Sequence, residues 1–182
     1  MKKKGVILNF SPHRKGNSDF IANRIYSKLR KCFSIEVINV SNLKIKECKG
    51  CEDYCTRNGK CKIKDDMSVL YQHFTDDDFL IVVSPIYFYH IPGYSKIAID
   101  RCQPFWCRKY ILKNLDLSSK KGFVVLIGAT KGKKLFSGVD LTLKYFFDVI
   151  NARFDKEYNL YLRNNLNLIP VIDKYVEKIV EK

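Results

Sequence analysis

Short, mainly apolar runs alternate along this chain with segments whose apolar residues recur at helical spacing. Runs of this kind predict strands buried on both faces of a parallel sheet. They occupy residues 6–10, 35–40, 79–83, 123–127 and 158–162. Helices are predicted by Ile21, Ile25, Leu29 and Cys32, by Met67, Leu70, Tyr71 and Phe74, by Ile97 and Ile99, by Val139, Leu143, Phe147 and Ile150, and by Ile172, Tyr175, Val176 and Ile179. The alternation predicts an α/β fold with a parallel sheet, in a single domain over residues 1–182.

Polar residues and proline predict where these helices begin and end. Asn17 or Ser18 is expected to cap the first helix. Asp65 and Asp66 are expected to place negative charge at the start of the next one. Pro104 is expected to interrupt the helix that carries Ile97 and Ile99.

The apolar runs are too short for a membrane protein or an exported one. The longest fully apolar run, residues 79–83, is far below the about 20 residues that a membrane helix needs. The apolar stretch after the lysine-rich start, residues 6–8, is shorter than the core of a signal peptide. We therefore expect a cytoplasmic protein that makes no contact with a membrane.

Basic residues outnumber acidic ones by 33 to 19, which gives a net charge of +14. A field of this sign attracts phosphates, nucleic acids and acidic proteins. The basic residues are scattered along the chain rather than arranged in a stripe, so a solvated, lysine-rich surface is the simplest interpretation. The net charge therefore favours anionic partners, but it does not indicate which of these classes binds.

Four of the seven cysteines lie within one expected loop of fourteen residues, 48–61, and they are Cys48, Cys51, Cys55 and Cys61. An odd total in a cytoplasmic chain argues against a disulfide framework. Four thiolates at this spacing are the ligands of an iron-sulfur cluster or of zinc, and unmetallated thiols remain a third interpretation. The other three, Cys32, Cys102 and Cys107, are expected to pack as small apolar side chains.

Three predicted strands are followed by segments with the chemistry of a ligand site, and ligands bind at the carboxyl ends of parallel strands. Residues 11–18 (SPHRKGNS) offer hydroxyls, cations and a helix start for a phosphate. They match neither the P-loop nor the dinucleotide-binding glycine pattern. Residues 84–89 (SPIYFY) offer aromatic side chains for a flat ring, and residues 128–132 (GATKG) allow close backbone approach.

Taken together and in this order, these segments resemble the flavodoxin-like NAD(P)H-dependent FMN reductases, and within them the iron-sulfur flavoproteins. Residues 11–18 are similar to the family's phosphate loop, 84–88 to its isoalloxazine loop and 128–132 to its third flavin loop. Residues 48–61 (CKGC to GKC) are similar to its compact cysteine segment. Asp100-Arg101 resembles the pair that closes the next helix, and we expect it to form an ion pair.

The resemblance implies a flavodoxin-like, doubly wound five-stranded sheet of order 2-1-3-4-5 with helices on both faces, and non-covalently bound FMN. The implied phosphate-binding residues are Ser11, Arg14, Lys15, Gly16, Asn17 and Ser18. The implied ring-binding residues are Pro85, Ile86, Tyr87, Phe88, Ala129, Thr130, Lys131 and Gly132. It also implies a homodimer or tetramer, and a [4Fe-4S] cluster on Cys48, Cys51, Cys55 and Cys61. The gap between Cys51 and Cys55 is one residue longer than the family's.

The expected activity is hydride transfer from NAD(P)H to FMN, followed by electron transfer to a flavin, a quinone or a protein. The flavin carries out the chemistry, so no catalytic side chain is assigned. Two alternatives remain: a basic, zinc-stapled module that binds nucleic acid, and a flavin electron carrier without catalytic activity. Nucleic acid is the less favoured partner, because Tyr54 is the sole aromatic residue of the cysteine loop.

Overall fold

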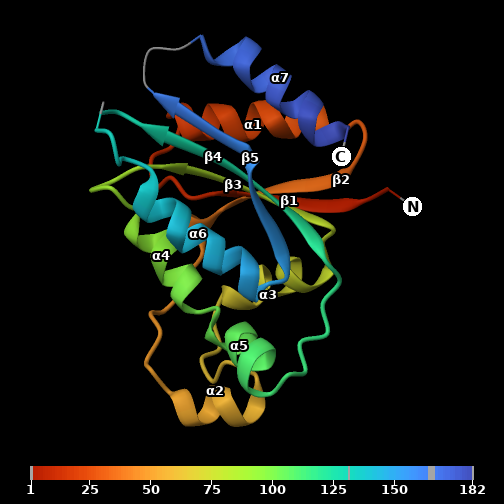
Figure 1. The fold of residues 1–182 in the computed structure, drawn as a ribbon, viewed down its shortest axis with the longest axis vertical. Coiled ribbons are helices and arrows are strands. Elements are labelled where there is room, and N and C mark those ends of the chain that lie inside the picture. Colours follow the sequence, from red (N-terminus) through yellow and green to blue (C-terminus); the bar gives the residue numbers. More distant parts are fainter. Residues whose placement is uncertain (1, 131, 164–166, 182) are drawn as a thin grey trace.

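The computed structural model describes residues 2–130, 132–163 and 167–181, in which five parallel strands form one sheet of order β2-β1-β3-β4-β5 (Figure 1). The strands are β1 (Lys4–Asn9), β2 (Ser34–Asn39), β3 (Phe79–Pro85), β4 (Lys120–Gly128) and β5 (Ala152–Arg163). The predicted α/β class, flavodoxin-like sheet and strand order are confirmed. β5 begins earlier than predicted, because an edge strand tolerates charged residues such as Arg153 and Asp155.

Helices cover both faces of this sheet, as Figure 1 shows. α1 (Asn17–Leu29) and α7 (Leu168–Val180) lie on one face, and α3 (Met67–Asp76), α4 (Gly93–Asp100) and α6 (Ser137–Val149) lie on the other. The lower end of the molecule is formed by α2 (Glu52–Asn58), α5 (Gln103–Trp106) and a π-helix, η2 (Cys107–Ile111). A 3₁₀-turn, η1 (Val40–Asn42), follows β2.

β3 shows how the apolar runs of the sequence build two cores. Leu80 and Val82 pack in the core beneath α3, α4 and α6, whereas Ile81 and Val83 pack beneath α1 and α7. All four side chains have at most 1% exposure. A sheet covered on both faces buries every residue of its central strands, which explains the continuous apolar runs. Within the described residues, no helix is both long and apolar enough to span a bilayer.

Three local predictions at helices are tested by the structure. The cap of α1 is Gly16, whose extended backbone suits the position, so the prediction of Asn17 or Ser18 is wrong and both lie in the first turn. Cys32 lies beyond the end of α1 and is exposed, so its predicted burial is also wrong. Pro104 marks the expected break, because α4 ends at Asp100 and Pro104 lies in the first turn of the next helix, α5.

The topology places three strand ends together. β1 pairs with β2 on one side and β3 on the other, so the chain reverses its winding direction between β1 and β3. Phe10 N donates to Val83 O at 2.9 Å, and Ile86 N donates to Ile127 O at 2.8 Å. The segments that follow β1, β3 and β4 therefore leave the sheet at one edge, where open α/β sheets bind ligands.

Candidate functional site

The loop after β1 is held by the buried side chain of Asn9. Its amide nitrogen donates to Asn39 Oδ1 at 2.8 Å and to Asp19 Oδ1 at 3.3 Å, and its oxygen accepts Ser11 N at 3.1 Å. The Ser11 hydroxyl accepts His13 N at 3.1 Å, so this side chain braces the loop itself. The sequence analysis did not single out Asn9, although a polar residue ending a buried strand was the available signal.

The predicted phosphate-binding residues converge on the amino end of α1. Arg14 and Lys15 are exposed, Arg14 donates to the side chain of Asn42, and Lys15 N donates to Asp19 Oδ2 at 3.2 Å. Ser18 is buried in the first turn of α1. A helix amino terminus directs its N–H groups and the positive end of its dipole outward, so this corner suits an anion.

The loop after β3 is a tight aromatic turn. Tyr87 N donates to His90 O at 2.8 Å and His90 N donates to Tyr87 O at 2.9 Å. Phe88 and Tyr89 have φ values of 48° and 60°, which form the left-handed pair of a type I′ turn. This backbone conformation is unfavourable for residues other than glycine. Phe88 is fully exposed at the tip. Strain of this kind concentrates at ligand sites, and here it holds aromatic side chains outward.

The loop after β4 contacts this aromatic turn. A Cβ at Gly132 would lie 2.5 Å from the Tyr89 hydroxyl oxygen, so the loop backbone closely approaches the Tyr89 side chain. Arg163, at the end of β5, donates to Thr130 O and to Gly132 O, the latter at 3.4 Å. Ala129 and Thr130 are exposed. The prediction for Lys131 lies outside the described residues.

The structure therefore brings the three predicted ligand segments to one edge of the sheet. Cations and a helix start lie at the β1 end, exposed aromatic side chains at the β3 end, and small residues at the β4 end. This arrangement is suited to a ligand with an anionic tail and a flat ring. Tyr89 belongs to the predicted aromatic segment, whereas His90 and Arg163 were not predicted, because their contributions depend on neighbours far away in the chain.

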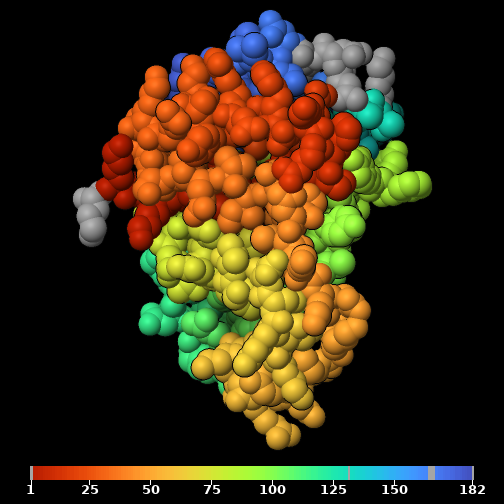
Figure 2. All heavy atoms as spheres, turned by 180° about the vertical axis from the view of Figure 1, so that it is seen from behind, coloured from red at the N-terminus to blue at the C-terminus, as the bar shows by residue number. Residues whose placement is uncertain are grey.

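The cysteine-bearing segment, residues 47–62, forms a second region of interest. It projects from the lower end of the molecule, as both Figure 1 and the view from behind in Figure 2 show. The expected continuous loop is wrong, because α2 occupies its middle. Cys51 is the cap residue of α2, and Cys55 lies one turn later, with Cys55 N donating to Cys51 O at 3.2 Å. These two thiols therefore share one face of the helix.

Thiols of this segment surround a cavity of about 500 Å³. Its lining includes Cys48, Cys51 and Cys55. Burial first, and then the neighbouring thiols Cys51, Cys107 and Cys61, raise the pKa of Cys55 to about 12. Among the residues that the structure describes, no three His, Cys, Asp or Glu side chains converge tightly enough to hold a single metal ion.

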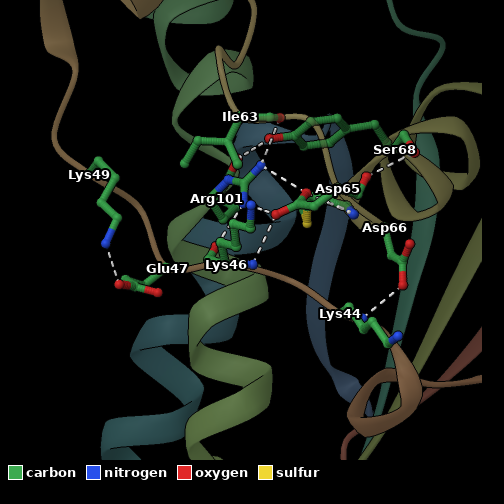
Figure 3. Close-up of polar contacts among 11 residues, drawn as sticks. Lys44, Lys46, Glu47, Lys49, Ile63, Asp65, Asp66, Ser68 and Arg101 are labelled. Carbon is green, nitrogen blue, oxygen red and sulfur yellow. Dashed lines mark hydrogen bonds and ion pairs between the residues drawn. The ribbon is translucent and has the colours of Figure 1, made fainter.

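Arg101 fastens both ends of the cysteine-bearing segment to the rest of the molecule (Figure 3). Its guanidinium donates to Lys46 O at 2.7 Å, to Ile63 O at 3.3 Å and to both carboxylate oxygens of Asp65 at 2.7 and 3.1 Å. The Arg101 and Asp65 side chains are 1% and 4% exposed. Burial opposes ionisation of Asp65, but hydrogen bonds from Arg101, Lys46 N and Met67 N outweigh it and lower the pKa of this carboxyl.

This arrangement corrects the predicted pairing of Asp100 with Arg101. Asp100 instead pairs with Lys96 one helical turn away on α4, whereas Arg101 points toward Asp65. Adjacent residues on a helix point in different directions, so a neighbouring pair cannot meet face to face. Asp65 and Asp66 lie at the start of α3 as expected, since Asp66 is its cap residue and Asp65 Oδ1 accepts Met67 N at 3.1 Å. The two carboxylates also accept Lys46 N and Lys44 N, at 2.9 and 2.8 Å.

Comparison with known proteins now adds to this geometry. The profile of a family described as NADPH-dependent FMN reductase matches residues 4–158. The chain belongs to this family. The match includes all three strand-end segments and the cysteine-bearing segment. The predicted resemblance to NAD(P)H-dependent FMN reductases is confirmed.

Relatives of this FMN reductase family member include iron-sulfur flavoproteins of two archaea. One from Archaeoglobus fulgidus is 30% identical over 134 residues, which is 73% of this chain and 57% of the relative. One from Methanocaldococcus jannaschii is 28% identical over 144 residues, 78% of this chain and 67% of the relative. The chain thus spans little more than half the length of the Archaeoglobus protein. The predicted subgroup is supported by these relatives.

Solved structures confirm the fold of this family member. An NAD(P)H:quinone oxidoreductase from Methanothermobacter marburgensis superimposes with a TM-score of 0.69 at 14% identity, covering 98% of this chain and 92% of the other. An FMN-dependent NADH-azoreductase from Bacillus anthracis, in complex with FMN, has a TM-score of 0.59 at 13% identity, with coverages of 98% and 97%. Flavodoxin 1 from Bacillus cereus has a TM-score of 0.59 at 17% identity, with coverages of 98% and 95%.

Proposed function

We propose that this chain is an FMN-dependent oxidoreductase that takes a hydride from NAD(P)H and passes electrons to a flavin, quinone or protein acceptor. The observation that carries the proposal is the convergence of the three ligand segments at adjacent strand ends. Membership of the FMN reductase family supports it. Nothing in the activity requires a catalytic side chain, since bound FMN supplies the hydride and electron chemistry.

In this proposal the β1 loop holds the phosphate of FMN. Asn17 and Ser18 lie in the first turn of α1, where main-chain N–H groups and the helix dipole favour an anion. Arg14 and Lys15 add positive charge from the exposed side of the loop. Ser11 acts as a brace through its bond to His13 N, and Gly16 supplies the extended backbone of the cap.

The aromatic turn and the β4 loop hold the ring in this proposal. Pro85, Ile86, Tyr87 and Phe88 form one wall, and Ala129, Thr130 and Gly132 form the other. The His90 ring lies 3.1 Å from Thr142 Oγ1 on α6, which ties the aromatic turn to the helix layer. Arg163 fixes the opposite wall through the carbonyl groups of Thr130 and Gly132. A ring held between two braced walls would leave one face for a nicotinamide.

We further propose an iron-sulfur cluster at the cysteine-bearing segment, acting as a one-electron relay. Several thiols around one cavity fit such a group by donor chemistry, because these clusters take cysteine thiolates. Names of the archaeal relatives support a cluster as well. The sequence spacing alone predicts Cys61 as the fourth ligand.

The proposal includes a cytoplasmic protein that forms a homodimer or tetramer. Large apolar side chains are exposed near the ring-binding edge and on α4 and α6, and a second copy would cover them. They are Phe88, Tyr94, Leu141 and Tyr145. Sedimentation of the flavin-loaded protein as a monomer would contradict this part of the proposal. Family membership leaves the nucleic-acid module unsupported.

The deciding experiment removes the polar groups proposed to hold the phosphate. The double variant Asn17→Leu with Ser18→Ala is expected to lose bound FMN, measured by released flavin and by titration of the apoprotein. Ser27→Ala is the matched control on the same helix, since its hydroxyl bonds to Arg24 O on the exposed face. Full flavin retention in the double variant contradicts the phosphate assignment. Rapid NADH or NADPH oxidation by the wild type separates the reductase from a passive electron carrier.

A further inference from the structure

Two cavities of about 500 Å³ each flank the π-helix η2 at the lower end of the molecule. The first, which we call the thiol cavity, is lined by Cys48, Cys51 and Cys55 and also by Cys107. The second is lined by Cys61 together with Tyr71 and Phe105. Cys61, the last cysteine of the sequence motif, therefore lines the second cavity, whereas Cys107, from outside the motif, lines the thiol cavity.

The position of α2 explains why the first three thiols meet η2. Gly59 ends the helix with a φ of 58°, and a Cβ there would lie 2.6 Å from Arg108 Cγ and 3.1 Å from Leu112 Cδ1. The carboxyl end of α2 is therefore pressed against η2. The face that carries Cys51 and Cys55 opens on the same cavity as Cys107, which is itself buried.

The π-turn sets the direction of Cys107. Leu112 N donates to Cys107 O at 2.8 Å, five residues apart rather than four, and such turns occur frequently at functional sites. The wider turn places Trp106, Cys107 and Ile111 along the thiol cavity, whereas Phe105 and Arg108 line the cavity of Cys61. A single short helix thus separates the two thiol environments.

Cys61 follows the turn at Gly59 and lies on the other side of this helix. Its neighbours in the lining include Asp65 and Arg108, and its side chain is partly exposed. Cys61 therefore lines a different cavity from the one that Cys48, Cys51 and Cys55 line.

We propose that Cys107 is the fourth thiolate of the thiol cavity, joining Cys48, Cys51 and Cys55 as ligands of an iron-sulfur cluster, with Cys61 outside the ligand set. The inference deepens the proposed function and rests on its cluster, not on its flavin. Each thiol that binds iron forms one sulfur–iron bond and releases one proton to solvent. The cavity, at about 500 Å³, has room for a group much larger than one water molecule, which occupies about 30 Å³.

The test compares serine variants purified without oxygen. Wild type, Cys61→Ser and the buried control Cys102→Ser are expected to retain about four irons and four sulfides per chain and the cluster's EPR signal after reduction. Cys107→Ser is expected to lose more than half of its iron. Loss of iron in Cys61→Ser with retention in Cys107→Ser overturns the proposal. Wild-type protein that holds FMN without iron overturns it too, yet leaves the flavin proposal standing, because flavin content and NAD(P)H oxidation are measured on the same samples.

Alkylation of the wild-type protein tests the same point without a variant. Iodoacetamide is expected to label Cys61 while iron is bound, and to label Cys48 and Cys51 after iron is removed with a chelator. Peptide mass spectrometry identifies the labelled thiols. The proposal is overturned if Cys61 stays unlabelled while iron is bound and becomes labelled once the iron is removed. This outcome can be read even if Cys107→Ser fails to fold.

Discussion

The ligand loops at the sheet edge and the cysteine-bearing segment are attached to the molecule in different ways. The loops continue strands whose side chains are buried on both faces, so the sheet register fixes where each loop starts. The segment joins the sheet through polar bonds around Arg101 and through contact of α2 with η2. The position of the ligand loops therefore depends on the core, whereas the position of the cysteine-bearing segment depends on a few buried charges.

The largest effect is expected from Arg101→Met. The change leaves the Asp65 carboxylate buried without its partner, and breaking a buried ion pair in this way costs about 3–5 kcal/mol. Urea unfolding measures the loss. Lys96→Met is the control, because it breaks an exposed pair with Asp100 and should cost about 0.5 kcal/mol or less. Equal stability of the two variants would contradict the role given to Arg101.

The next effect separates packing from backbone strain within the segment. Gly59 and Gly50 have nearly the same φ, 58° and 62°, but a Cβ at Gly59 meets Arg108 whereas one at Gly50 meets open space. Gly50→Ala is expected to cost about 1 kcal/mol, and Gly59→Ala about 2–3 kcal/mol, with loss of iron as a second readout. Thermal unfolding compares them. Equal costs would show that contact with η2 does not position α2.

At the sheet edge, Phe88→Gly should leave stability nearly unchanged and weaken flavin binding. The variant relieves a left-handed φ of 48° at a fully exposed side chain, and glycine's greater freedom in the unfolded chain offsets the gain. The apoprotein should change by less than about 1 kcal/mol, while the Kd for FMN rises about tenfold. Fluorescence titration measures the affinity. A stable variant with unchanged Kd would remove Phe88 from the ring site.

The smallest effect concerns pH, which acts in opposite directions on the contacts of His73 and of Asp65. The hydrogen bond to Asp77 raises the pKa of His73, so its stabilisation is complete below about 6.5 and is lost as the pH rises through the raised value. The lowered pKa of Asp65 gives stabilisation above about 3.9 that is lost as the pH falls through the lowered value. His73→Gln should flatten the alkaline limb of the stability profile by less than about 1 kcal/mol and leave the acid limb intact. An unaltered alkaline limb would contradict the assignment.

The fold and the ligand edge followed from the sequence because their signals are local. Residues 79–83 are continuously apolar, and the segments after the strands carry their chemistry within a few positions. The pairing of Arg101 with Asp65 joins residues 36 apart, and no spacing rule predicts it. Cys107 was expected only to pack, because its direction depends on one wide π-turn. Arg163 was missed since its contact with the β4 loop exists only after β5 is placed in the sheet.

The Arg101 contacts also mark the place where the cysteine-bearing segment joins the sheet domain. Residues 44–46 and 63–66 meet around one side chain, so the chain leaves the sheet domain and returns to it at nearly the same point. An insertion with adjacent ends can change in length or content without shifting the register of any strand. Exchange of this one surface module would therefore add or remove the proposed electron relay while the ligand loops at the sheet edge stay in place.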